Sequence, residues 1–123
     1  IRRVIKLLRQ GSIIWYGPDQ DFGAKNSIFV PFFGFPTATI TATSRIAQST
    51  KANIIFMSQY RKEKGRYLVK LSDSSKNFPS KDITADCAFI NKKMEEAILL
   101  APDQYWWLHR RFKTRPLGEE KIY

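Results

Sequence analysis

The chain has 123 residues and a mass of 14.3 kDa, and with 43% hydrophobic and 14% aromatic residues it is one domain or less, with enough apolar side chains for a core. Its net charge of +10 favours an anionic partner such as a phosphate group, an acidic protein, a nucleic acid or an anionic bilayer. One cysteine, Cys87, excludes an internal disulfide and a cysteine-rich metal site, and the apolar run Ile28–Phe35 is far shorter than the roughly 20 residues of a spanning helix.

The N-terminal half predicts two helices separated by two extended segments. Apolar residues at helical spacing among cations predict an amphipathic basic helix that ends at Gly11. The β-branched and aromatic segment Ser12–Tyr16 predicts a buried strand that delivers the next loop to the end of a sheet. A second extended segment, Ile28–Phe33, leads to Thr37, which we expect to cap a helix that ends near Thr50.

The C-terminal half predicts a hairpin, a loop and a long helix. Residues 53–71 contain two apolar runs around a charged tip, a pattern typical of a β-hairpin. Residues 72–81 are rich in Ser, Lys and Asp and predict a loop. The next helix begins at Asp82 or Thr84 and ends near Leu100. Strands and helices in this order predict an α/β fold with a mixed sheet.

The loop Pro18–Gly23, with the sequence Pro-Asp-Gln-Asp-Phe-Gly, carries two carboxylates two residues apart. Asp19 and Asp21 could bind a metal, act as a general acid or base, or orient basic groups. The alternative is structural, because aspartates in turns accept hydrogen bonds from the loop's own N–H groups.

The segment Ala101–Pro116 combines aromatic residues and the only histidine with four cations, which are Arg110, Arg111, Lys113 and Arg115. Four cations at this spacing cannot share one helix face, so at least two should point at solvent or at an anion. The planar guanidinium group suits phosphate, and we expect Arg110 and Arg111 to contact an anionic ligand ahead of Lys113 and Arg115. A solvated, charged tail is the alternative.

Together with Phe29–Gly34, which reads Phe-Val-Pro-Phe-Phe-Gly, these motifs resemble the lipid A biosynthesis acyltransferases over the whole chain. The resemblance implies a glycerolphosphate-acyltransferase-like α/β sandwich with a mixed sheet, of which residues 1–123 form the C-terminal part. It implies transfer of a fatty acyl chain from acyl carrier protein to a hydroxyl of a lipid A precursor, Kdo2-lipid IVA or its acylated product. The expected location is the cytoplasmic face of the bacterial inner membrane, and no cofactor or metal is expected.

The family's general base is a histidine in a His-x-x-x-x-Asp or His-x-x-x-x-Glu motif. His109 is the only histidine, and Thr114 stands five residues after it, so the chain lacks this motif. We therefore expect the motif and a membrane anchor upstream of Ile1, an inactive 123-residue fragment, and a packed, hydrogen-bonded ring at His109. Asp19 falls on a position that the family needs for activity, which makes it the stronger supporting candidate and Asp21 the weaker.

Aromatic residues are the remaining candidates, as contacts for an acyl chain or the membrane. Phe29, Phe32 and Phe33 lie close to the Asp-containing loop in the sequence, although plain core packing is the alternative for them. Since Phe32 and Phe33 are neighbours on an extended backbone, at most one should face the core. Trp106 and Trp107 stand beside cations, as is typical of a bilayer interface.

Two other functions stay open from the sequence. An acyltransferase of the phospholipid pathway, acting on glycerol phosphate, is the nearer one, and the block Arg110–Pro116 argues against it. A nucleic-acid-binding module is more remote: aromatic rings between cations could stack on bases, but the sequence carries no recognisable nucleic-acid-binding motif. Nucleic acid is therefore not an expected partner.

Overall fold

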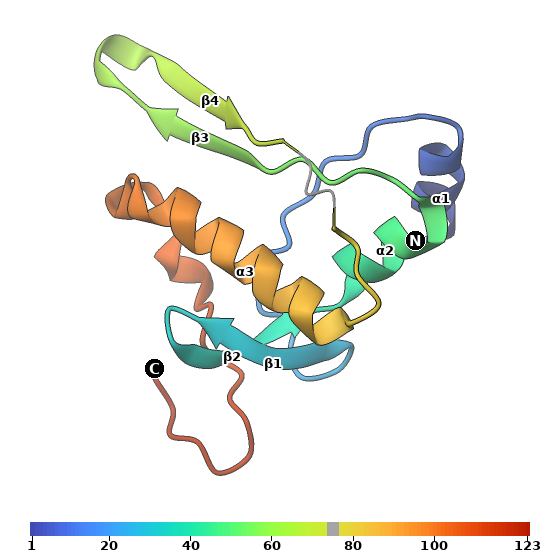
Figure 1. Cartoon of the computed structure of the whole chain (residues 1–123). Coiled ribbons are helices and arrows are strands. Elements are labelled where there is room, and N and C mark those ends of the chain that lie inside the picture. Colours follow the sequence, from blue (N-terminus) through green and yellow to red (C-terminus); the bar gives the residue numbers. More distant parts are fainter. Residues whose placement is uncertain (74–76) are drawn as a thin grey trace.

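The computed structural model describes residues 1–73 and 77–123. In chain order it contains α1 (Arg2–Arg9), β1 (Ser27–Phe32), β2 (Phe35–Ile40), α2 (Ala42–Thr50), β3 (Met57–Arg61), β4 (Tyr67–Leu71) and α3 (Ile83–Leu99). Short 3-10 turns are η1 (Glu63–Gly65), η2 (Pro102–Gln104) and η3 (Trp107–His109). Helix α3 runs between the two strand pairs (Figure 1).

Strands β1 and β2 form an antiparallel hairpin closed by Phe33 and Gly34. Both turn residues have a positive φ, 49° and 81°, and glycine enters this left-handed region without strain. Because side chains alternate along a strand, Val30 and Phe32 both point inward and are 2% and 0% exposed. This hairpin therefore supplies one wall of the core.

Strands β3 and β4 form a second antiparallel hairpin, which lies on the side of α3 opposite the first hairpin (Figure 1). Its tip at η1 is charged, as the sequence predicted. Tyr60 is the inward-facing residue of β3, and its hydroxyl donates to the Ala97 carbonyl of α3 at 2.9 Å. All five residues of β4 are exposed, so this hairpin is attached mainly through β3.

Helix α3 begins where the sequence indicated. The carboxylate of Asp82 accepts hydrogen bonds from the N–H groups of Thr84 and Ala85 at 2.8 and 3.2 Å, which satisfies two donors that a helix start leaves free. The helix ends at Leu99, shortly before Pro102, which lacks an N–H and cannot continue it. Asp82, not Thr84, is therefore the cap.

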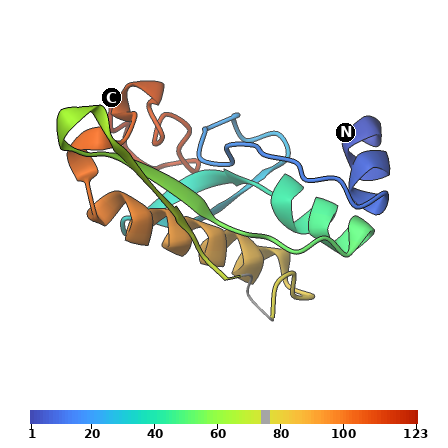
Figure 2. The same ribbon diagram turned by 90° about the horizontal axis from the view of Figure 1, so that it is seen from above.

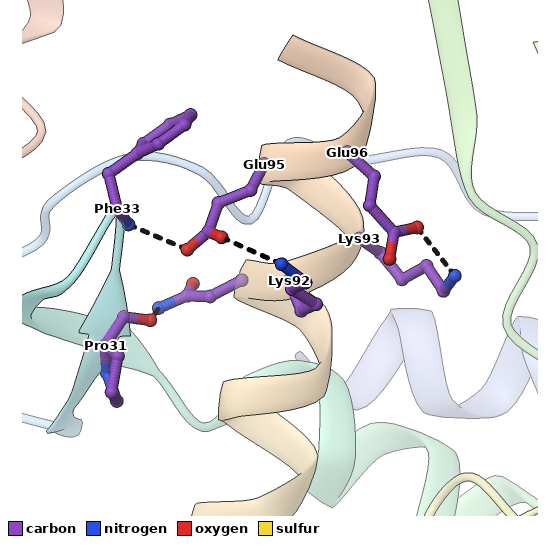
Figure 3. Close-up of polar contacts among 7 residues, drawn as sticks. Pro31, Phe33, Lys92, Lys93, Glu95 and Glu96 are labelled. Atoms are coloured by element: carbon purple, nitrogen blue, oxygen red, sulfur yellow. Dashed lines mark hydrogen bonds and ion pairs between the residues drawn. The ribbon is translucent and has the colours of Figure 1, made fainter. Parts of the chain in front are cut away.

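Polar side chains of α3 fasten it to the first hairpin, as Figure 3 shows. The amide of Asn91 donates to the Pro31 carbonyl at 2.9 Å, and Glu95 accepts from the N–H of Phe33 at 2.7 Å. Lys92 lies 3.7 Å from the other oxygen of Glu95. These bonds fix the turn of the β1–β2 hairpin against the second half of α3.

The core lies between β1, α3 and the segment that follows η3. Phe32, Ile98 and Phe112 form its buried centre, and three partly buried residues pack around them: Phe33, Met94 and Tyr105. The C-terminal segment lies beside the segment that precedes β1, as Figure 2 shows from above. The chain's two most informative sequence motifs are thus brought together.

Two predicted elements are wrong. Ser12–Tyr16 pairs with no strand among the described residues, and Ile13 and Trp15 are 96% and 73% exposed, so it is no buried strand here. Thr37 does not cap a helix, because the tight turn sends the chain back along β1 and Thr37 lies inside β2. The cap residue of α2 is Thr41.

The fold is α/β, as predicted, but the described strands form two separate antiparallel pairs instead of one mixed sheet. The predicted loop over residues 72–81 falls partly outside the described residues, since 74–76 are not among them. Among the helices described, none combines the length and apolar character needed to cross a bilayer.

Candidate functional site

Asp21 ties the loop 18–23 to the C-terminal segment. Its side chain is buried, with Oδ1 accepting from the N–H of Gly23 at 2.8 Å and Oδ2 accepting from the N–H of Thr114 at 2.7 Å. The first bond closes the loop, and the second connects it to a residue 93 positions away. This geometry gives Asp21 the structural role that the sequence left as an alternative, and a chemical role for it stays a prediction.

Asp19 lies half-buried at the wall of a groove, close to the C-terminal segment. Its carbonyl oxygen is 3.2 Å from Nε2 of His109. Its carboxylate is near enough to Tyr105 and Arg111 to act on the pKa of both groups. The aspartate that the sequence favoured is therefore surrounded by a histidine, a phenol and a guanidinium group.

Tyr105 and His109 form a pair, with the tyrosine hydroxyl 3.2 Å from Nε2. Nδ1 of His109 contacts the Trp106 carbonyl, which can only accept, so Nδ1 carries a hydrogen. A protonated ring then donates from Nε2 to the Asp19 carbonyl and the Tyr105 hydroxyl oxygen together, whereas a neutral ring only accepts from the Tyr105 hydroxyl. Burial, and next the negative charge of Asp19, raise the pKa of Tyr105, so its phenol stays protonated at neutral pH. The prediction of a hydrogen-bonded ring at His109 is confirmed.

Arg111 is wholly buried behind this pair, with 0% exposed. It donates to the Ala38 carbonyl at 2.7 Å, to Oγ1 of Thr39 at 3.1 Å and to Oδ1 of Asn91 at 3.3 Å. Its guanidinium carbon also lies 5.0 Å from the centre of the Phe32 ring. These contacts join β2, α3 and the C-terminal segment through one side chain.

The assignment of Arg111 to substrate binding needs correction, because a side chain with no exposed surface cannot reach a substrate phosphate. Burial lowers the pKa of this guanidinium, and Tyr105, Asp21 and Asp19 oppose that shift. Arg111 therefore supplies positive charge to both aspartates from inside the fold. The sequence could not reveal the burial of Arg111, because a run of cations does not indicate which of its side chains points into the core.

The other three cations differ from one another. Arg115 donates to the Pro36 carbonyl at 2.7 Å and pairs with Glu119 at 3.0 Å, so its side chain is largely occupied. Arg110 and Lys113 are exposed. The expectation that at least two cations point at solvent is thus met by Arg110 and Lys113, which stay candidates for anion binding.

A groove of about 380 Å³ lies between the segment before β1, the β3 region and α3. Apolar side chains dominate its walls, and they include Ile14, Ile54, Ile55, Phe56, Ile90, Met94 and Ile98. Asp19 and Tyr105 line the same groove, so an acidic and a phenolic residue lie beside apolar walls. Such a combination is typical of sites that hold an apolar ligand by its polar end.

The aromatic candidates separate into buried and exposed residues. Phe32 is 0% exposed at the core centre, so its assignment to acyl-chain or membrane contact needs correction. Phe33 is partly buried against the core, whereas Phe29, Trp106 and Trp107 are 38%, 68% and 41% exposed. None of the five is among the described residues that line the groove, and membrane contact by the exposed ones stays a prediction.

Tyr105 is the site residue that the sequence interpretation did not assign. It stands in the quoted C-terminal block, four residues before His109, but its type and position alone gave no reason to prefer it over the two tryptophans. Its contact with His109 and its place beside Asp19 depend on the fold. No group of three or more His, Cys, Asp or Glu side chains suited to a metal occurs in the part of the chain described.

A comparison with known protein families shows which family this chain belongs to. Residues 1–114, which include the Asp19 loop, Tyr105 and His109, match the family model of the bacterial lipid A biosynthesis acyltransferases. The chain belongs to this family. It is 38% identical over its whole length to the lipid A biosynthesis lauroyltransferase of Escherichia coli K12 and 36% identical to the palmitoleoyltransferase of that strain. Over 94% of its length it is 40% identical to a lipid A biosynthesis acyltransferase of Haemophilus influenzae.

The matches cover a limited part of these relatives. The chain spans 41% of the length of the lauroyltransferase, 40% of the palmitoleoyltransferase and 38% of the Haemophilus protein.

Proposed function

We propose that this chain is part of an enzyme that transfers a fatty acyl chain from acyl carrier protein to a hydroxyl of a lipid A precursor. The observation that carries the proposal is the family match, which spans the Asp19 loop and the C-terminal residues packed against it. Lipid A acyltransferases of E. coli and H. influenzae are similar along nearly the whole chain.

The proposed step forms one ester bond and breaks one thioester bond. The acceptor hydroxyl oxygen attacks the thioester carbonyl carbon, a base takes the hydroxyl proton, and the carrier's sulfur leaves with the electron pair of the C–S bond and takes up a proton. The expected base, a histidine of the His-x-x-x-x-Asp or Glu type, is not among these 123 residues. This chain would contribute the Asp19 carboxylate, which orients basic groups of the site.

The apolar groove suits a fatty acyl chain, because its walls are mainly aliphatic and aromatic while Asp19 and Tyr105 lie on its surface. Arg110 and Lys113 are exposed and positive, so they can meet the phosphates of the acceptor or the acidic surface of the carrier protein. A net charge of +10 and exposed tryptophans also favour binding to the surface of an anionic bilayer. We therefore propose that the enzyme acts at the cytoplasmic face of the inner membrane.

Replacing Asp19 in the full-length enzyme tests this role. Asp19→Ala should lower kcat about 100-fold or more, because the carboxylate that orients the site is lost. The measurement is acyl transfer from an acyl carrier protein thioester to a Kdo-bearing, tetra-acylated lipid A precursor. Asp103→Ala, an exposed aspartate of η2, is the control and should retain full activity. Wild-type turnover of Asp19→Ala would refute the role.

A further inference from the structure

The loop with Asp19 is held at two points by the C-terminal segment. Asp21 accepts from Thr114, and the Asp19 carbonyl meets Nε2 of His109. The Asp21–Thr114 contact lies beyond Asp19 in the chain, whereas the His109 contact acts on the backbone of Asp19 itself. The direction of the Asp19 side chain therefore depends on what fixes His109.

His109 is fixed in turn by two neighbours. Nδ1 bonds to the Trp106 carbonyl in the same 3-10 turn, and Nε2 meets the Tyr105 hydroxyl at 3.2 Å. The Tyr105 ring stacks edge to face on both His109 and Trp107, at centroid distances of 5.3 and 4.8 Å. The Asp19 carboxylate is near enough to the same phenol to raise its pKa.

We propose that Tyr105 and His109 are positioning residues of the acyl-transfer reaction, which hold Asp19 with its carboxylate toward the groove. Neither residue has to touch the reacting thioester or hydroxyl. They act through Asp19, and the inference rests on the proposed function. A displacement of about 1 Å in a reacting geometry can cost about 100-fold in rate, so losing either contact should be measurable.

The test uses the full-length enzyme, the carrier-protein thioester and the Kdo-bearing precursor described above. Tyr105→Phe removes only the hydroxyl, and His109→Ala removes the ring. Each should lower kcat about 10- to 100-fold and leave KM for the acceptor unchanged, because neither residue binds it. His109→Gln, whose amide can reach the Nε2 position, should recover part of the loss. Asp82→Ala, which removes the cap at the opposite end of α3, is the control for reduced stability and should keep the wild-type kcat.

A double-mutant cycle separates positioning from general structural damage. If Tyr105 acts through Asp19, Tyr105→Phe should cost less than about threefold in an Asp19→Asn background. Full additivity of the two changes, or wild-type kcat for both Tyr105→Phe and His109→Ala, would overturn the inference while Asp19 keeps its role. Wild-type turnover of Asp19→Asn would remove the role of Asp19 and this inference with it, while the acyl-transfer function stands. No acyl transfer by the unsubstituted enzyme would remove the proposed function as well.

Discussion

At the scale of single residues, the two aspartates of the loop 18–23 differ in what surrounds them. Both oxygens of Asp21 accept backbone hydrogen bonds inside the protein, so its charge is used to hold the loop. Asp19 lies on the groove with its carboxylate beside Tyr105 and Arg111. Burial and hydrogen bonding therefore distinguish two residues that the sequence presents as a pair.

Asp21→Asn should destabilise the protein without an equal effect on chemistry. The amide keeps one acceptor oxygen, so one of the two N–H groups loses its partner, at a cost of about 1–3 kcal/mol. Thermal unfolding of the full-length enzyme is the measurement, with Asp103→Asn as the exposed control. An unchanged Tm for Asp21→Asn would show that the loop does not depend on this tether.

Substitutions at Arg110 and Arg111 should have different effects, although the two residues are adjacent in the sequence. Arg111→Met removes three hydrogen bonds from a buried cation and leaves its acceptors unpaired, so we expect a loss of about 3 kcal/mol in the free energy of unfolding. Arg110→Ala should leave Tm unchanged and raise the apparent KM for the acceptor. Denaturant unfolding and steady-state kinetics check the two effects. The reverse pattern would return Arg111 to the surface role predicted from the sequence.

At the scale of elements, local chemistry decided what the sequence could predict. The cap at Asp82, the helix over α3 and the charged hairpin tip depend on neighbouring residues, and all three are confirmed. Ser12–Tyr16 needed a partner strand that no described segment provides. The prediction for Thr37 failed because a helix cap and a β-branched strand residue look alike until the turn at Gly34 is known.

The candidate site could be predicted only in part, for the same reason. Asp19, Asp21 and the C-terminal block were identifiable from their residue types and from the family resemblance. The contact of His109 with the Asp19 carbonyl, and the burial of Arg111, follow from contacts between segments about 70 to 90 residues apart. No local pattern encodes such contacts.

Cys87 offers a test of how α3 packs on β2. Its side chain is fully buried, Sγ lies 3.7 Å from the Ile40 carbonyl, and burial raises its pKa from 9.0 to about 11. The thiol should therefore resist iodoacetamide at pH 8.5 until the protein unfolds. The pKa of the Cys87 thiol is higher in the folded protein than in the unfolded chain. The buried neutral thiol therefore contributes to stability below pH 9, and this contribution is lost as the pH rises through about 11.

The check on Cys87 is peptide mass spectrometry after labelling with and without denaturant, together with unfolding measured from pH 8 to 11. Cys87→Ala should weaken the fall in stability over that range. Rapid native labelling would contradict the close packing of α3 against β2.

At the scale of the whole molecule, the C-terminal segment connects the first hairpin, the core and the Asp-containing loop. It crosses the face of β2 through Arg111 and Arg115, contributes Phe112 to the core, and meets the Asp-containing loop through His109 and Thr114. The basic charge and the exposed aromatic residues remain on the outside. This arrangement links the stability of the fold to the position of Asp19.

The measurement that tests the central claim most directly is acyl transfer by the full-length enzyme. A series of acyl carrier protein thioesters serves as donors. The Kdo-bearing lipid A precursor and glycerol 3-phosphate are offered as alternative acceptors. We predict transfer to the lipid A precursor, with one acyl length preferred and glycerol 3-phosphate left unmodified. Acylation of glycerol 3-phosphate in place of the precursor, or transfer to neither acceptor, would contradict the proposed function.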